Sequence, residues 1–360
     1  MLPSKFFDPP SANNTTNAGR PQRCAPPPLG MTGVMCKIGS LDIPNRGTIQ
    51  YRIFRPRQLQ QKPPLVVLHG GPLIPCNYLL PLAYVVVDRS IVVYDQLGCG
   101  QSKTVVKPSA LTRTNPETGE EETSRLDVDG MVRDLDLLIK HWKFDKYHLL
   151  GHSFGGILLF EYLKYCRDTN SLEELQKCQS AVLASVPTST AIVEQEVQRL
   201  CRELTGNDEE EDDSDDDGVT TLSKKVPKAF REQHECRLVP MPFPLMDSYS
   251  QAGPPRLRGL QSIGDYKASL VVVSVDSKNT ASEGAQEEEE PIPEKLQQPA
   301  LILRGQHDFV TETCVEGWDG LFDRVQHMTL AGCSHYGMLE NEILYGSVLS
   351  SFLGDADQLS

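Results

Sequence analysis

The segment Tyr147–Gly156 reads YHLLGHSFGG, and the apolar run ILLFEY follows it at residues 157–162. Apolar residues lead into Gly-x-Ser-x-Gly and a helical pattern comes next, which is the strand, sharp turn and helix in which a serine acts as a nucleophile. Glycines at Gly151 and Gly155 let the strand and the helix approach closely. We therefore predict that Ser153 occupies a strained turn with its hydroxyl directed into a cleft.

Short apolar runs and amphipathic segments alternate on both sides of this turn. Strands that alternate with helices predict an α/β fold with a doubly wound, mostly parallel sheet of about eight strands. In such sheets the ligand cleft lies at the carboxyl ends of the strands. Further strands are expected at residues 34–38, 48–54, 64–68, 90–94, 180–184, 299–303 and 325–330, and helices at 128–142, 190–204, 228–238 and 340–353.

Composition divides the chain into four parts. Residues 1–32 are rich in Pro, Asn and Thr and are expected to be a disordered leader. Residues 33–186 form the first part of the core, and residues 299–360 form its second part. The regular alternation is lost over residues 187–298, which we interpret as an inserted, mainly helical cap with acidic loops. Within it, residues 270–275 have strand character that has no place in this scheme.

Charge is concentrated in two short stretches. The chain has 35 basic and 49 acidic residues and a net charge of −14, but residues 208–217 hold nine carboxylates and residues 287–290 hold four. The rest is close to neutral, so no basic surface favours nucleic acid. The acidic stretches are expected to be solvated loops and are candidate contacts for a protein partner.

Other bulk properties exclude several classes of protein. No run approaches the eighteen apolar residues of a membrane-spanning helix, so no membrane contact is expected. Ten cysteines without C-x-x-C pairs predict reduced thiols in a cytoplasmic protein and neither a metal site nor a disulfide scaffold. No cofactor is expected.

Three chemically suitable side chains follow predicted strands. Ser153, Asp308 and His335 occur in the order nucleophile, acid, base of the hydrolases built on this kind of sheet. A serine hydroxyl is too weak an acid to attack unaided, so His335 takes its proton while Asp308 holds the imidazole tautomer. His307 and Asp319 are the weaker rivals.

The oxyanion of the reaction needs two backbone N–H donors. One is expected from Phe154, which follows the nucleophile, and the other from Gly71 in the loop His69-Gly70-Gly71-Pro72 after an earlier strand. Glycine suits this loop because a Cβ would obstruct the substrate. His69 and Gly70 are therefore also candidate substrate-binding residues.

Four segments together resemble the proline iminopeptidase family of α/β-hydrolases. His69–Pro72 matches the HGGPG motif, Asp95–Ser102 matches DQxGxGxS, and Gly151–Gly156 matches GxSWGG. Phe230–Leu238 resembles the F-Y-x-x-H-x-C-R segment of the subgroup that includes tricorn-interacting aminopeptidases and L-amino-acid amidases. The resemblance covers roughly residues 33–353 and implies the α/β-hydrolase fold.

The resemblance also implies release of an N-terminal residue, often proline, through an acyl-enzyme on Ser153. Family members bind the free amino group with carboxylates, one in a cap motif G-P-x-E-F and one directly after the catalytic Asp. This chain has Arg256 in the first position, within Gly253–Leu257, and Phe309 in the second. Arg256 and Phe309 are both candidate substrate-binding residues.

These departures leave several functions open. The leading one is an aminopeptidase acting on a small peptide or amide. The alternative is a carboxylesterase or amidase of altered specificity, with a carboxylate-bearing substrate held by Arg256, unless Asp247 or Glu312 replaces the missing acids. A remote alternative is a ligand-binding or scaffold protein, although such a protein has no need of Ser153, Asp308 and His335 together.

Overall fold

The structure is a computed structural model that describes most of the chain from residue 33 onward. The described ranges are 33–56, 62–105, 127–169, 171–205, 226–270 and 294–359, without the side chains of Thr205, Arg256 and Gln261. The predicted leader, both acidic stretches and all but the first residue of the unplaced strand 270–275 lie outside these ranges. Residues 33–360 form one compact unit.

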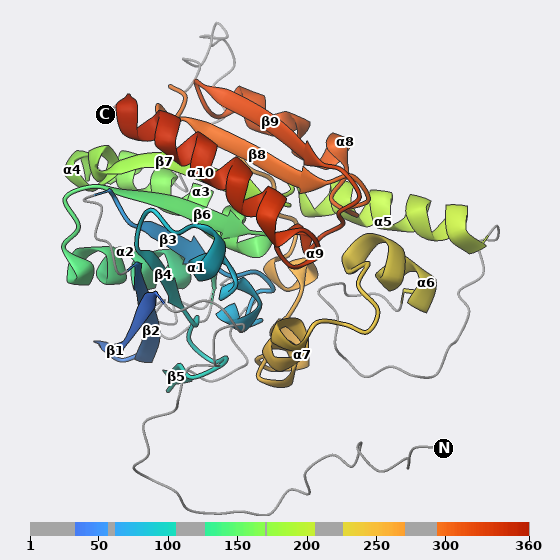
Figure 1. Cartoon of the computed structure of the whole chain (residues 1–360), viewed down its shortest axis with the longest axis horizontal. Coiled ribbons are helices and arrows are strands. Elements are labelled where there is room, and N and C mark those ends of the chain that lie inside the picture. Colours follow the sequence, from blue (N-terminus) through green and yellow to red (C-terminus); the bar gives the residue numbers. More distant parts are fainter. Residues whose placement is uncertain are drawn as a thin grey trace, which may run out of the picture. The chain divides into compact units, whose positions relative to one another are not determined.

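A nine-stranded sheet forms the centre of the fold (Figure 1). Its strands lie in the order β1-β2-β4-β3-β6-β7-β8-β9, and β5 pairs with β2. Pairing is antiparallel where β2 meets β1, β4 and β5 and parallel from β4 to β9, which confirms the predicted fold class. The strands are β1 (Val34–Ile43), β2 (Gly47–Pro56), β3 (Leu65–Leu68), β4 (Ile91–Tyr94), β5 (Lys103–Thr104), β6 (Tyr147–His152), β7 (Cys178–Ala184), β8 (Ala300–Gly305) and β9 (Val325–Leu330).

Helices cover both faces of the sheet. Helix α2 begins where the Asp127 side chain accepts the Gly130 N–H at 2.7 Å, because this bond satisfies a donor that has no partner inside the helix. The α-helices are α1 (Leu82–Val85), α2 (Val128–Trp142), α3 (Phe154–Asp168), α4 (Leu172–Lys177), α5 (Thr190–Thr205), α6 (Lys228–Phe230), α7 (Phe243–Ser250), α8 (Glu312–Val315), α9 (Gly337–Glu340) and α10 (Glu342–Gln358). The shorter turns are η1 (Cys76–Leu79), η3 (Arg231–Glu235), η4 (Pro255–Leu257), η5 (Leu260–Ile263) and η6 (Glu316–Gly320).

Strand alternation produces two apolar layers. In β3, Val66 and Leu68 belong to the layer that contains the buried residues of α2 and α3, whereas Leu65 and Val67 belong to the layer beneath α1 and α10. All four side chains are fully buried, as expected for a parallel strand covered on both faces. Each such burial contributes roughly 1.5–3 kcal/mol.

The predicted cap, residues 187–298, leaves the sheet after β7. Its described part contains α5, α6, η3, α7, η4 and η5 before the chain returns at β8. The helix expected over residues 228–238 ends at Glu235, and the Pro- and Met-rich stretch that follows contains α7. Helix α7 packs against η1, where the Tyr78 N–H donates to the Ser248 hydroxyl at 2.9 Å.

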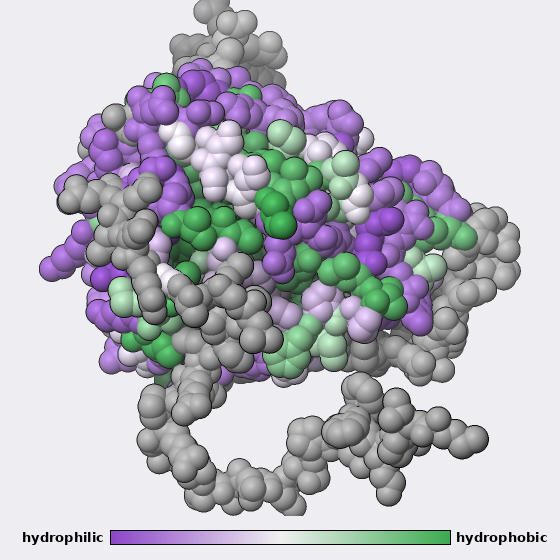
Figure 2. All heavy atoms as spheres, in the orientation of Figure 1, coloured by the Kyte–Doolittle hydropathy of each residue, from purple (hydrophilic) through white to green (hydrophobic). Residues whose placement is uncertain are grey.

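The surface is mostly hydrophilic with apolar residues gathered near the middle of one face (Figure 2). Within the described ranges, no helix combines the length and the apolar character needed to cross a bilayer. Exposed large apolar side chains include Val239, Phe243 and Ile343.

Candidate active site

Ser153 lies on a sharp turn between β6 and α3. Its backbone has φ 53° and ψ −125°, a conformation that costs a non-glycine residue on the order of 1–3 kcal/mol. The Ser153 N–H donates to the Ala184 carbonyl at 2.8 Å and ties the turn to β7. A Cβ on Gly151 would run into Gly155, and one on Gly155 would run into the Leu68 carbonyl. The two glycines therefore permit the close contact of strand and helix that the turn requires.

Asp308 and His335 follow β8 and β9 and form a buried pair. His335 Nδ1 lies 2.9 Å from Asp308 Oδ1, which also accepts the Val310 N–H at 2.9 Å. The opposite ring nitrogen, His335 Nε2, is buried and has no hydrogen-bond partner among the described residues. With the Nδ1 proton directed at the carboxylate, Nε2 carries a lone pair that can accept a proton.

His152 joins the predicted nucleophile, the base and the glycine loop. Its Nε2 lies 2.9 Å from the His335 carbonyl, so Nε2 carries the proton and donates. Its Nδ1 accepts from the Tyr78 hydroxyl at 2.8 Å, and that hydroxyl accepts the Gly70 N–H at 2.8 Å. Burial lowers the pKa of His152 well below its usual value, and the neighbouring His335 adds to this effect. His152 is therefore a neutral tether between loops.

The loop after β3 supplies the candidate oxyanion donors. A Cβ built on Gly70 would lie 3.0 Å from the Ser153 Cβ, so the loop passes directly beside the predicted nucleophile. Gly71 has φ +113°, which favours glycine, and its N–H donates to no other described residue. The Phe154 N–H is the first of α3 and has no acceptor inside that helix. Both predicted donors are thus available to an oxyanion.

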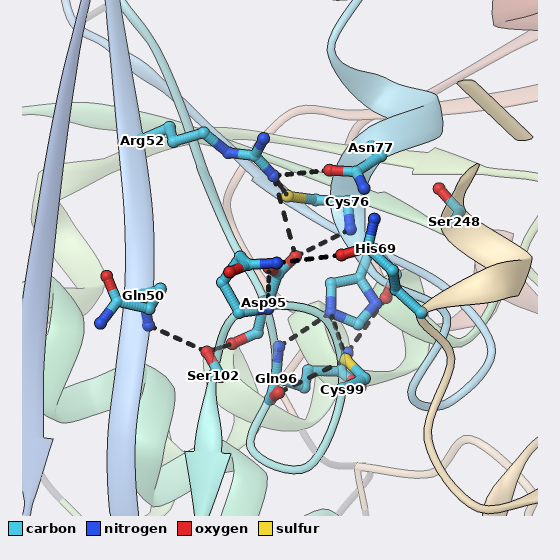
Figure 3. A network of polar contacts seen from close by, with 12 residues as sticks. Gln50, Arg52, His69, Cys76, Asn77, Asp95, Gln96, Cys99, Ser102 and Ser248 are labelled. Atoms are coloured by element: carbon cyan, nitrogen blue, oxygen red, sulfur yellow. Dashed lines mark hydrogen bonds and ion pairs between the residues drawn. The ribbon is translucent and has the colours of Figure 1, made fainter. Parts of the chain in front are cut away.

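The loop between β4 and β5 holds the glycine loop in place (Figure 3). The Gln96 N–H donates to His69 Nε2 at 2.9 Å, and the Gln96 side chain donates to the His69 carbonyl at 3.1 Å and accepts the Leu73 N–H at 3.1 Å. His69 Nδ1 lies 3.0 Å from the Gly70 carbonyl. Burial lowers the pKa of His69, so the imidazole is neutral. Both ring nitrogens of His69 thus have protein partners, so the side chain supports the loop and has no ring nitrogen left to bind a substrate.

Asp95 fixes the other end of this network. Its two carboxylate oxygens accept the N–H groups of Cys76 and Gln101, each at 3.0 Å. The Ser102 hydroxyl donates to the Asp95 carbonyl at 2.6 Å and accepts the Gln50 N–H at 2.9 Å (Figure 3). The Asp-Gln-x-Gly-x-Gly-x-Ser motif is therefore a brace for the glycine loop, a role that spacing alone did not reveal.

The structure describes the two candidate specificity positions to different extents. Phe309 is 1% exposed and stacks on His335, with ring centroids 4.2 Å apart and planes 28° apart. The backbone of Arg256 lies in η4, but its side chain is outside the described part of the chain.

The two alternative acids, Asp247 and Glu312, both have protein partners. Asp247 accepts hydrogen bonds from the side chains of Asn77 at 2.7 Å and Gln251 at 2.9 Å. The Glu312 side chain is 78% exposed and pairs with Arg304 at 3.3 Å.

His307 and Asp319, the weaker candidates, take no part in the side-chain pair that Asp308 and His335 form. Asp319 pairs with His327 at the surface, with oxygens 3.1 Å from His327 Nε2. His307 contributes its main chain, and its carbonyl oxygen lies 2.8 Å from His234 Nδ1. Among the described residues, no cluster of His, Cys, Asp and Glu has the makings of a metal site.

Known proteins resemble this chain over most of its length. A family model for the alpha/beta hydrolase fold matches residues 63–342. Proline iminopeptidase of Lactobacillus delbrueckii subsp. bulgaricus is 25% identical over 300 residues, which cover 82% of this chain and 90% of that enzyme. Proline iminopeptidase of Lactobacillus helveticus is 35% identical over 156 residues, which cover 43% of this chain and only 45% of that enzyme.

A solved structure agrees with these matches. The crystal structure of proline iminopeptidase from Mycobacterium smegmatis superposes with a TM-score of 0.64 at 20% identity, covering 90% of this chain and 99% of that one. At that identity the likeness concerns the fold alone. The family model spans most of the sheet and the turn that carries Ser153, and the chain accordingly belongs to the α/β hydrolase fold family, with proline iminopeptidases among its relatives.

Proposed function

We propose that this protein is a serine hydrolase that forms an acyl-enzyme on Ser153. In the first step His335 Nε2 takes the Ser153 hydroxyl proton while Oγ bonds to the substrate carbonyl carbon. The negative charge on the carbonyl oxygen is met by the N–H groups of Gly71 and Phe154. The leaving group then takes the proton from His335, and a water molecule repeats the sequence to release the acid.

One observation carries this proposal. His335 Nε2 is buried without a partner among the described residues, while Nδ1 is held by Asp308 at 2.9 Å. Leaving a buried acceptor unsatisfied costs about 1–3 kcal/mol, so such an atom calls for a function. A base aligned by a carboxylate and awaiting a proton is the function that fits this geometry.

The substrate we propose is a short peptide or amide from which the N-terminal residue, of the proline type, is released. The similarity to proline iminopeptidases supports this substrate class. Cleavage of an amide needs both stabilisation of the oxyanion and protonation of the leaving nitrogen. The glycine loop can supply the first, and the proposed base His335 can supply the second.

A second candidate is an esterase or amidase acting on substrates without a free amino group. Phe309 favours it, because an aromatic ring stacked on His335 replaces the expected carboxylate with an apolar surface. A substrate ammonium finds no charge attraction at that position.

Two measurements test these proposals. Labelling with a fluorophosphonate probe, with S153A as the control, tests the serine mechanism, and an unlabelled wild-type Ser153 in folded protein would refute it. Turnover of proline and alanine 4-nitroanilides beside their N-acetylated forms and 4-nitrophenyl esters then separates the two substrate classes. Hydrolysis of only the acetylated amides and esters would favour the second candidate.

A further inference from the structure

His234 in η3 contacts the loops that carry the acid and the base. Its Nδ1 lies 2.8 Å from the His307 carbonyl, and its own carbonyl accepts the His335 N–H at 3.3 Å. A carbonyl can only accept, so Nδ1 carries the proton and Nε2 is left with a lone pair. The residue is 5% exposed, and its Nε2 has no hydrogen-bond partner within the described ranges.

Aromatic rings connect this acceptor to the base. The His234 ring lies 5.1 Å from Phe230, which lies 6.3 Å from Phe309, and Phe309 stacks on His335 at 4.2 Å. Burial lowers the pKa of His234, so the ring stays neutral and remains an acceptor at neutral pH. Phe230 and Phe309 thus connect the two imidazoles through apolar ring contacts, which we call the aromatic wall.

A buried position is compatible with a contact to the substrate. The predicted base has the same property, because His335 Nε2 is also buried and also lacks a partner among the described residues. Both atoms are therefore buried acceptors, and they belong to two residues that are in direct main-chain contact. In the proposed reaction the acyl part of the substrate stays attached to Ser153 while the leaving group departs to solvent. A buried acceptor therefore suits the acyl part better than the leaving group.

We propose that His234 Nε2 is a specificity determinant that accepts a hydrogen bond from an N–H or O–H group on the acyl part of the substrate. This inference rests on the proposed serine hydrolase function. A neutral imidazole selects for a donor without requiring a charge, so it serves an amino, an imino or a hydroxyl group. A site that hydrogen-bonds a substrate donor rejects the analogue without it more strongly than an apolar pocket rejects a change of size.

Three matched substrates test the assignment. The 4-nitroanilides of alanine, lactic acid and propionic acid differ only in carrying an amino group, a hydroxyl group or a hydrogen on the same carbon. We expect H234N to lower kcat/KM for the alanyl and lactoyl compounds by about 10- to 100-fold and to leave the propionyl compound within about twofold. The compound with the larger loss of kcat/KM shows whether the amino or the hydroxyl group is the preferred donor to His234.

Two variants, H234N and H234Q, separate a hydrogen bond to the substrate from support of the neighbouring loop. Asparagine places an N–H near the position of Nδ1, so H234N keeps the bond to the His307 carbonyl and loses only the acceptor. Glutamine reaches the position of Nε2, so H234Q retains an acceptor and is expected to recover at least a tenfold preference for donor-bearing substrates. An equal loss on all three substrates, or no loss on any, would overturn the assignment.

A second readout does not require turnover. Alaninamide, lactamide and propionamide are tested for protection of Ser153 against the fluorophosphonate probe, and H234N should weaken protection by the first two alone. Absence of probe labelling in the folded wild-type protein would refute the proposed function itself. Labelling with unselective protection in both proteins would refute only the role of His234.

Discussion

The core and the predicted cap meet the base in different ways. In the core, polar side chains from short motifs hold each group, as Asp308 holds His335 and Gln96 holds His69. On the cap side, the main-chain carbonyl of His234 accepts the His335 N–H, and Phe230 packs against Phe309, the core residue that stacks on His335. The comparison supports the proposal that polar contacts among nearby strands hold the reacting groups, while the predicted cap contributes to selection of the substrate.

Among changes in the core, we expect removal of the proposed nucleophile to have the largest effect on activity. We expect S153A to lower turnover by about 10⁴-fold or more and to abolish fluorophosphonate labelling, because the proposed acyl-enzyme forms on this hydroxyl. Steady-state kinetics with mass spectrometry of the labelled protein measures both. Residual labelling at another serine with retained turnover would contradict the assignment of Ser153.

We expect removal of the charge of Asp308, the proposed acid, to have the next largest effect on activity. D308N should reduce kcat by about 10³- to 10⁴-fold, because an amide in this position permits the wrong imidazole tautomer of His335. Circular dichroism and melting temperature check that the variant folds. If kcat of D308N stayed within tenfold of the wild-type value, the catalytic acid would have to be another residue. D319N, a change at a surface carboxylate, is the control.

A pH series tests His148, one of the two buried histidines of β6. Burial, assisted by the charge of Arg89, lowers the pKa of His148 from 6.5 to about 4, and its ring contacts Ser180 at 2.7 Å and Asp357 at 3.0 Å. Between pH 6.5 and 4 the unfolded chain binds the proton and the folded chain does not, so stability falls as the pH is lowered.

We expect this residue to remove about 2 kcal/mol of unfolding free energy between pH 7 and pH 5, equivalent to about 30-fold in the folding equilibrium. Urea unfolding at the two pH values measures it. H148N should be less stable at pH 7 but lose less stability on acidification. The same pH dependence in both proteins would show that other groups account for it.

Two tyrosines provide the smallest and most direct comparison of core and cap. Y78F removes the hydroxyl that links the Gly70 N–H to His152, and we expect kcat to fall about tenfold because the oxyanion loop loses a support. Y249F removes a hydroxyl that donates to the buried Glu235 at 2.7 Å. It should lower the melting temperature and change kcat less than about twofold. Equal effects on kcat would remove the distinction between the two regions.

The sequence predicted the regular elements well where periodic or motif signals were long. The helix expected over residues 128–142 is α2, because apolar spacing and the Asp127 cap agree. The two-residue strand β5 carries no periodic signal, and neither does the four-residue helix α8.

The candidate site was predictable only in part, for a physical reason. Ser153, Asp308 and His335 follow strand ends, so topology alone brings them to one edge of the sheet. Tyr78 belongs to no motif, and the contact of His234 with His307 joins residues 73 positions apart. Such contacts depend on how an insertion returns to the sheet, which local patterns do not encode.

The positive φ of Ser153 has a practical consequence for selection experiments. A glycine would occupy that backbone conformation without the crowding of a Cβ, so S153G relieves the turn while destroying the nucleophile. Screens of this protein for heat resistance alone would enrich the inactive glycine, and thermal screening has to be paired with a probe of serine reactivity.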